Sequence, residues 1–157
     1  PLRPYAQRRL FDLLDVEIGA WQQDPQGHYF GGNNLAVSPR GLLRFGQIHL
    51  NGGTWNGTRV LPEWWPPLAW TPFVDNAYRD FQYGLSWWIG DFDGIRTYFA
   101  WGYGGQFLFV APDLNLVAVM TSSLTDRPAN LGDYSTRLMR FWRTSVVPTV
   151  ASFETSE

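Results

Sequence analysis

The sequence predicts an α+β fold, in which an antiparallel sheet of about four strands is covered by helices. Two observations lead to this prediction. Apolar residues recur at three- and four-residue spacing near residues 39–51 and again at 131–146, as they do in amphipathic helices. Between these segments, β-favouring stretches follow one another with only short turns between them. Consecutive strands with short links pair antiparallel, and helices segregated from the strands are typical of the α+β class.

Composition limits the possible partners. The chain has 157 residues, of which 45% are hydrophobic and 17% charged, so we expect 1–157 to form a single domain or part of one. The net charge of −2, without a basic stripe, argues against nucleic acid. The lack of cysteine excludes disulfides and a cysteine nucleophile. No apolar run approaches the roughly 20 residues of a membrane span.

The first half of the chain contains two expected helices. Residues 4–14 have apolar side chains near one face, and 39–51 follow Ser38, a favourable N-cap, with Pro39 in the first turn. Closely spaced turn formers predict irregular structure over 15–37. Asn56-Gly57 lies between β-favouring residues and predicts a two-residue hairpin turn.

The strands are expected in the second half. Pro66-Pro67 should stop any helix, so that 66–80 form a connecting loop. Apolar residues then alternate over 81–90, which predicts one strand, and Asp93-Gly94 predicts a turn. Three more strands are expected, with the last two joined by a turn at residues 112–115; these strands comprise 95–100, 106–111 and 116–122.

The C-terminal segment is predicted to be helical and then frayed. Tyr134, Leu138, Phe141 and Trp142 recur at helical spacing, so 131–146 should cover one face of the sheet and end before Pro148. The polar ending predicts a flexible tail over 149–157.

Several kinds of catalytic site are poorly supported by the residues. His28 and His49 are 21 positions apart and belong to no ligand pair, so we expect no metal and no cofactor. Ser38 and Ser86 lack the glycine-flanked motif that positions a serine nucleophile beside a histidine. The carboxylates that a glycosidase would need all stand in turn-forming contexts that already explain them; these are Asp24, Glu63, Asp91, Asp93 and Asp113.

The nine tryptophans suggest an alternative function, a noncatalytic module that binds carbohydrates or peptides. Its platform would be built from Trp64-Trp65, Trp87-Trp88 and Trp101. Alternation along 81–90 places Trp87 and Trp88 on opposite faces of the sheet, so at least one of them should belong to the core.

A glycine-rich link between two expected strands is the candidate site. It consists of Trp101, Gly102, Tyr103, Gly104 and Gly105. Three glycines within four residues are typical of a tight connection. They also let main-chain N–H groups approach a substrate oxygen closely. The residues themselves leave both interpretations open.

The order of several segments resembles the penicillin-binding-protein-like serine hydrolases, which are related to class C β-lactamases. The strongest resemblance lies in 101–117, which reads WGYGGQFLFVAPDLNLV. The supporting stretches lie in the same order from about residue 5 to 122; they are 9–14, 21–27, 31–35, 38–47, 51–57 and 81–88.

The resemblance implies an acyl-enzyme mechanism with a serine three residues before a lysine, an assisting tyrosine and main-chain oxyanion donors. In the family the serine, lysine and tyrosine precede the region matched here. We therefore expect an N-terminal segment of the same protein, covalent or cleaved, as partner. The resemblance also implies a small ester or amide substrate.

The family's third motif aligns on Ala100-Trp101-Gly102, where only the glycine is retained. The resemblance therefore implies ester or amide hydrolysis rather than β-lactam hydrolysis. It assigns one oxyanion donor to the N–H of Tyr103, with Trp101 and Tyr103 shaping the pocket. The resemblance alone suggests a periplasmic or extracellular location.

The chain opens with Pro1-Leu2-Arg3, without an initiator methionine or a signal-peptide pattern, and therefore looks like a cut chain. We expect it to be inactive by itself. A third possibility is a truncated or degenerate copy that folds without any activity.

Overall fold

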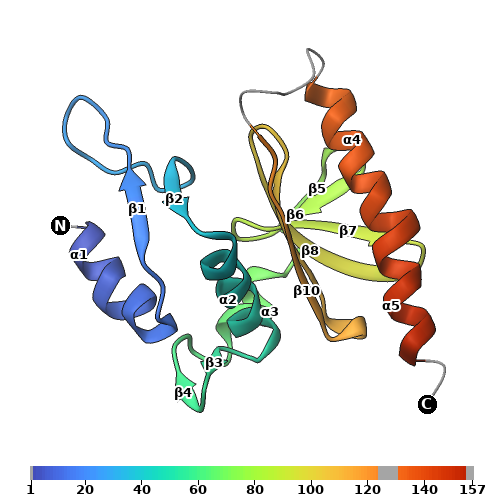
Figure 1. Ribbon diagram of the computed structural model, residues 1–157, viewed down its shortest axis with the longest axis horizontal. Helices are drawn as coiled ribbons and strands as arrows, with labels where there is room; N and C mark the ends of the chain where they lie inside the picture. Colours follow the sequence, from blue (N-terminus) through green and yellow to red (C-terminus); the bar gives the residue numbers. More distant parts are fainter. Residues whose placement is uncertain (1, 124–130, 155–157) are drawn as a thin grey trace.

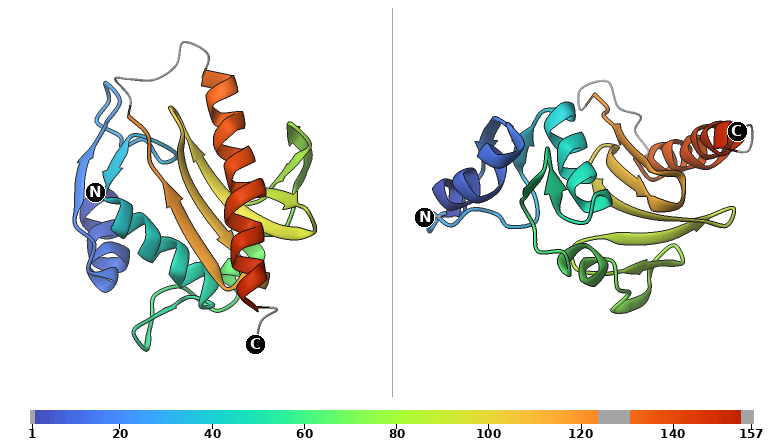
Figure 2. Two further views of the ribbon diagram at one scale, coloured as in Figure 1. Left: turned by 45° about the vertical axis from the view of Figure 1, so that its right-hand side comes forward. Right: turned by 90° about the horizontal axis from the view of Figure 1, so that it is seen from below.

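The computed structural model of the protein describes residues 2–123 and 131–154. One antiparallel sheet lies between two helical layers, with α2 (Pro39–Leu50) on one face and the C-terminal helix on the other (Figure 1). Figure 2 shows the same layers from two further directions. The N-terminal residues lie beyond α2, on the side away from the sheet. This arrangement is α+β, as the sequence predicts.

The sheet has six strands, not about four, in the order β10-β9-β8-β7-β6-β5. Every neighbouring pair is antiparallel. The strands are β5 (Val74–Tyr78), β6 (Phe81–Tyr83), β7 (Trp88–Phe92), β8 (Ile95–Gly102), β9 (Gln106–Ala111) and β10 (Leu116–Met120). The short 3₁₀ helix η3 (Pro112–Leu114) joins β9 to β10, where the sequence predicts a turn.

The additional strands arise where two predictions are wrong. The stretch 81–90 is not one strand, because the chain turns back after Tyr83 and β6 pairs with β7. Ser86 has φ +66, and Leu85 donates its N–H to the carbonyl of Ala69 at 2.9 Å. The predicted loop 66–80 also contains β5, which reaches β6 through a turn with positive φ at Arg79 and Asp80.

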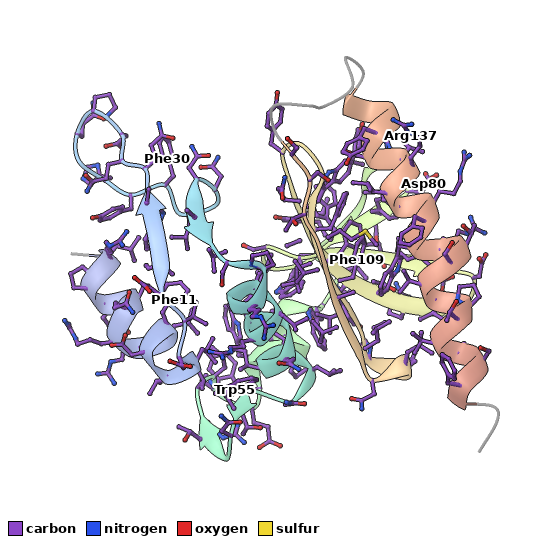
Figure 3. The ribbon with its side chains drawn as sticks, viewed as in Figure 1. Phe11, Phe30, Trp55, Asp80, Phe109 and Arg137 are labelled. Carbon is purple, nitrogen blue, oxygen red and sulfur yellow. The ribbon has the colours of Figure 1, made fainter. Side chains whose placement is uncertain are left out.

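Residues 2–37 form a small layer of their own. Residues 2–14 are helical, as α1 (Leu2–Ala6), η1 (Gln7–Phe11) and η2 (Asp12–Leu14), which confirms the predicted helix. The predicted irregular stretch 15–37 is wrong in part, because β1 (Ile18–Trp21) and β2 (Leu35–Val37) pair antiparallel at its two ends. The turn formers occupy the loop between these two strands. In Figure 3, Phe11 and Trp55 lie on the side of α2 away from the sheet.

Helix α2 begins at the predicted residue, and the predicted hairpin follows it. The Ser38 side chain accepts the N–H of Gly41 at 3.0 Å and so caps the helix. After the helix, β3 (Thr54–Trp55) and β4 (Thr58–Arg59) form the hairpin expected around Asn56-Gly57. Both turn residues have positive φ, as a two-residue turn of this type requires.

The two prolines at 66 and 67 do not stop a helix. They lie inside α3 (Trp65–Ala69), within its first turn. N–H groups of a first turn have no partner inside the helix, so proline is tolerated there. Trp70 donates its N–H to the carbonyl of Pro66 at 3.0 Å and completes the turn.

The C-terminal helix is longer than predicted. It runs through α4 (Leu131–Phe141), the π-helical turn η4 (Trp142–Val146) and α5 (Val147–Glu154). Pro148 does not end it, because the wider turn lets Val147 donate to the carbonyl of Trp142 just before the proline. The predicted tail is therefore wrong over 149–154, where Val150 and Ala151 pack on the core, and residues 155–157 lie outside the described residues.

Each face of the sheet buries its own cluster. Toward the C-terminal helix, Phe99, Phe107 and Phe109 pack with Trp142, and Figure 3 shows Phe109 between sheet and helix. Toward α2, Leu108 and Val110 pack with Trp87. Helix α2 approaches the sheet closely at Gly46, where a Cβ atom would lie 2.6 Å from Val117 and 2.7 Å from Leu108.

No helix among the described residues is long and apolar enough to cross a membrane.

Candidate active site

The glycine-rich link forms the turn between β8 and β9. Trp101 and Gly102 are the last two residues of β8, and Gln106 begins β9 opposite Gly102. Gly104 and Gly105 have φ of +78° and +86°. Residues with side chains rarely adopt these angles, so the glycines let the chain reverse here within three residues. The structure therefore brings the five candidate residues together at one end of the sheet.

Among the described residues, no strand pairs with one side of β8 at this end. The register of β8 with β9 continues to Gly102, whereas its register with β7 ends at Phe99. β8 thus extends past β7 over Ala100, Trp101 and Gly102. An exposed stretch of strand edge presents main-chain N–H and C=O groups to whatever lies beside it.

The side chains of the link have two different environments. Tyr103 is 68% exposed, whereas Gly104 and Gly105 are buried. Trp101 faces the C-terminal helix and stacks on Phe107 with 5.8 Å between ring centroids. Arg79 lies over the Trp101 ring at 5.8 Å from its centroid, a cation–π distance. Trp101 therefore belongs to an aromatic cluster, and its role in a pocket stays a prediction.

A polar network supports the turn from behind. The Ser122 hydroxyl donates to the carbonyl of Gly105 at 3.0 Å, and the Tyr134 hydroxyl donates to Ser122 Oγ at 2.8 Å. The Gln106 side chain bonds both main-chain groups of Ser122. The sequence reasoning missed Gln106, Ser122 and Tyr134, because separations of 12 to 17 residues carry no local pattern.

The tryptophans do not share one surface. Trp87 is only 4% exposed and packs on the α2 face, whereas Trp88 packs on the opposite face beside Trp101. The predicted division of the two adjacent indoles is therefore confirmed. Trp64 and Trp65 lie together at the start of α3, with ring centroids 6.0 Å apart. The alternative of a binding platform stays a prediction, and Trp87 takes no part in it.

The two histidines lie in different environments, one in the core and one on the surface. His49 is 2% exposed and lies against Phe45, Trp70 and Trp87. Its Nδ1 lies 2.9 Å from the carbonyl of Phe45. Burial lowers the pKa of His49, while this hydrogen bond raises it by a smaller amount. His28 lies on the surface, 3.4 Å from a carboxylate oxygen of Asp24.

Three of the five carboxylates considered for acid–base chemistry hold turns or form an ion pair. Asp24 accepts N–H groups from Gln26 and His28, and Asp91 accepts the N–H of Gly94. Asp93 binds Arg143 of the C-terminal helix, and this hydrogen bond lowers the pKa of the Asp93 carboxyl. Within residues 2–123 and 131–154, no group of three or more His, Cys, Asp or Glu residues is placed to hold a metal ion.

Two shallow hollows lie outside the turn. One of about 520 Å³ lies beside β1 and β2, and one of about 460 Å³ lies near the start of α2. The first is lined by Ala20, Trp21, Gln22, Asn34, Leu35 and Ala36. Neither hollow includes a residue of 101–105.

The fold has known relatives. The chain is similar in fold to the solved structure of a putative 6-aminohexanoate-dimer hydrolase from Bacillus anthracis, with a TM-score of 0.69 and 20% sequence identity. The match covers 96% of this chain and 38% of that protein, so the chain spans about two fifths of its relative's length.

The sequence profile of the Beta-lactamase family matches residues 5–138. The chain therefore belongs to the β-lactamase family. No curated protein matches it.

Proposed function

We propose that this chain is the C-terminal portion of a serine hydrolase that cleaves a small ester or amide through an acyl-enzyme. The main-chain N–H of Tyr103, at the end of β8, is one oxyanion donor in this proposal. The serine, lysine and tyrosine of the mechanism are supplied by a segment that precedes residue 1. Membership of the β-lactamase family and the serine-hydrolase-like fold support the reaction class.

The observation that carries the proposal is the uncovered end of β8. Beyond Phe99 the strand has β9 on one side and no β7 pairing on the other. The turn that follows is built from Tyr103, Gly104 and Gly105. Such a strand end brings main-chain donors close to a substrate carbonyl without interference from side chains, and rigid donors of this kind stabilise an oxyanion strongly.

The proposed reaction has two steps, acylation of the serine and hydrolysis of the acyl-enzyme. The serine hydroxyl oxygen bonds to the substrate carbonyl carbon while its proton passes to the neighbouring base. The negative charge that develops on the carbonyl oxygen is stabilised by main-chain N–H groups. The bond to the alcohol or amine then breaks, and the leaving group takes the proton. Water repeats the same steps on the acyl-enzyme, releasing the acid and restoring the serine.

The apolar edge strand β10 also supports the proposal that a further segment packs against this chain. β10 is the last strand of the sheet in the described part of the chain, and all of its side chains are only half-buried. Its residues Leu116, Val117, Ala118, Val119 and Met120 are all apolar. An apolar edge of this kind is usually covered by another strand or helix.

A fluorophosphonate probe tests the proposal, because it labels serine nucleophiles that are activated as described. The complete polypeptide that contains residues 1–157 should be labelled at one serine outside this chain, and heat-denatured protein should not. Absence of labelling in folded, complete protein would refute the proposal.

The chain alone provides a second test. Since it lacks the proposed nucleophile, residues 1–157 should hydrolyse p-nitrophenyl acetate no faster than a heat-denatured control. Turnover well above that control would place the nucleophile inside this chain and contradict the proposal that a preceding segment supplies it.

A further inference from the structure

Three elements converge on the carbonyl of Gly105. The turn brings the end of β8 and the start of β9 to this carbonyl, Ser122 follows β10, and Tyr134 belongs to α4. Ser122 Oγ lies 3.0 Å from the Gly105 oxygen, and the Tyr134 hydroxyl lies 2.8 Å from Ser122 Oγ. A serine hydroxyl has a single proton, which here goes to Gly105, so the phenol must be the donor to Ser122. The hydrogen bonds therefore run in one direction, from α4 to the turn.

Ser122 is itself held by the first residue after the turn. The Gln106 side-chain amide donates from Nε2 to the carbonyl of Ser122 at 2.8 Å, and Ser122 N–H donates to Gln106 Oε1 at 3.3 Å. The register of β10 with β9 ends at Met120 and Phe107. The Gln106 side chain thus continues the ladder beyond its last main-chain pair and fixes where the Ser122 hydroxyl lies.

The space behind the turn is filled. A Cβ atom on Gly105 would lie 2.7 Å from Leu138 Cδ1, 2.8 Å from Tyr134 Cε1 and 3.0 Å from Ser122 Oγ. The turn therefore cannot move toward α4 without a clash, while the hydroxyl of Ser122 prevents it from moving away. Packing and hydrogen bonding together define one position for the main chain over 103–105.

We propose that Ser122 and Tyr134 are positioning residues, which hold the main-chain amides of residues 103–105 in place for acyl transfer. This inference rests on the proposed function, because it gives the held amides a task in the reaction. An oxyanion site works only when its donors are fixed before the charge develops, and small displacements of such donors cost rate rather than substrate binding.

Four variants of the complete polypeptide test the inference. Ser122→Ala removes the hydroxyl that bonds Gly105, Ser122→Thr restores a hydroxyl, and Tyr134→Phe removes only the distant donor. The control is Thr144→Ala, which removes an exposed hydroxyl from the same helix, where it bonds the carbonyl of Arg140 far from the turn.

The first measurement does not depend on activity. Hydrogen exchange of the buried Gly104 and Gly105 amides should become about tenfold faster in Ser122→Ala, as expected when one ordinary hydrogen bond no longer opposes local opening. Ser122→Thr and Thr144→Ala should exchange like the wild type. Unchanged exchange in Ser122→Ala would overturn the inference, whatever the protein catalyses.

The second measurement is the rate of labelling by the fluorophosphonate. Ser122→Ala should lower the maximal rate about 10- to 100-fold with little change in the probe concentration for half-maximal rate. Tyr134→Phe should show a smaller loss, and Ser122→Thr should recover most of the wild-type rate. Labelling of Ser122→Ala at the wild-type rate would overturn the inference.

The outcomes separate the two proposals. A wild-type protein that is never labelled refutes the proposed function, and with it the catalytic task of the held turn. If the wild type is labelled and Ser122→Ala is labelled at the same rate, only the inference is refuted. Should Ser122→Ala not fold, as judged by thermal melting, Tyr134→Phe provides both measurements, and the wild-type result in both would overturn the inference.

Discussion

At the scale of single residues, Gly105 occupies a position that only glycine fits. Its φ is +86°, and a Cβ atom would contact three side chains at 3.0 Å or less. We expect Gly105→Ala to destabilise the protein by about 2–4 kcal/mol, from an unfavourable backbone conformation and overpacking together. Urea denaturation measures this loss.

Gly94 provides the matched control for this substitution. It has a similar φ of +89°, but a Cβ atom there would have nothing within 4 Å. Gly94→Ala should therefore cost only the backbone part, about 1–2 kcal/mol. Equal losses in the two variants would show that the crowding around Gly105 contributes nothing to stability.

His49 should make the stability of the protein depend on pH. Burial lowers its pKa below the ordinary value of about 6.5, so the unfolded chain binds a proton that the folded chain resists. Its contribution to stability is complete above pH 6.5 and is lost as the pH falls from 6.5 toward the lowered pKa of the folded state. Urea denaturation between pH 8 and pH 5.5 should show this decline.

Two variants identify the residue responsible. His49→Phe replaces the imidazole with an apolar ring among Phe45, Trp70 and Trp87 and should flatten the pH dependence. His28→Gln, at the exposed histidine, should leave the decline in place. A His49→Phe protein with the wild-type dependence would assign the effect to another group.

At the scale of elements, Trp142 is the largest buried side chain by which the C-terminal helix packs on the sheet. This side chain is 0% exposed and stacks on Phe109, with ring centroids 4.4 Å apart. Trp142→Ala should cost about 3–5 kcal/mol, the usual loss for a large buried aromatic residue. Phe141→Ala, at a 53% exposed neighbour on the same helix, should cost less than about 1 kcal/mol in the same urea experiment.

Some elements could be predicted from the sequence and others could not. Helix α2, the Asn56-Gly57 turn and β9 were predictable, because a cap, a glycine turn and a run of apolar residues act locally. The break of 81–90 into two strands was not predictable from the sequence, because it depends on a hydrogen bond from Leu85 to the carbonyl of Ala69, the last residue of α3. Strand β5 was missed because Arg79 and Asp80, rather than glycines, adopt the positive φ of its turn.

At the scale of the whole molecule, the sequence located the candidate turn but not what holds it. Gly102, Gly104 and Gly105 marked a tight connection between two strands, and the structure brings them to the end of β8 that extends past β7. Ser122 and Tyr134 meet the turn only through the pairing of β10 with β9 and the packing of α4. Contacts of this kind depend on the tertiary fold and leave no local pattern.

The uncovered strand β10 leads to a prediction about the isolated chain. If the preceding segment of the proposed function covers this strand, residues 1–157 alone expose an apolar edge with unpaired main-chain groups. The isolated chain should then associate with itself at concentrations of about 100 µM, by pairing at that edge, and sedimentation velocity would detect the association.

A charge at the end of this edge should weaken the association, because a lysine that must be desolvated opposes strand pairing. Thr121→Lys places it at an exposed position directly after β10, and Thr58→Lys places the same charge on the exposed strand β4 as a control. Only Thr121→Lys should shift the sedimentation profile toward the monomer. A monomeric wild-type chain at every concentration would show that β10 needs no covering strand, and the argument for a preceding segment would then depend on the family alone.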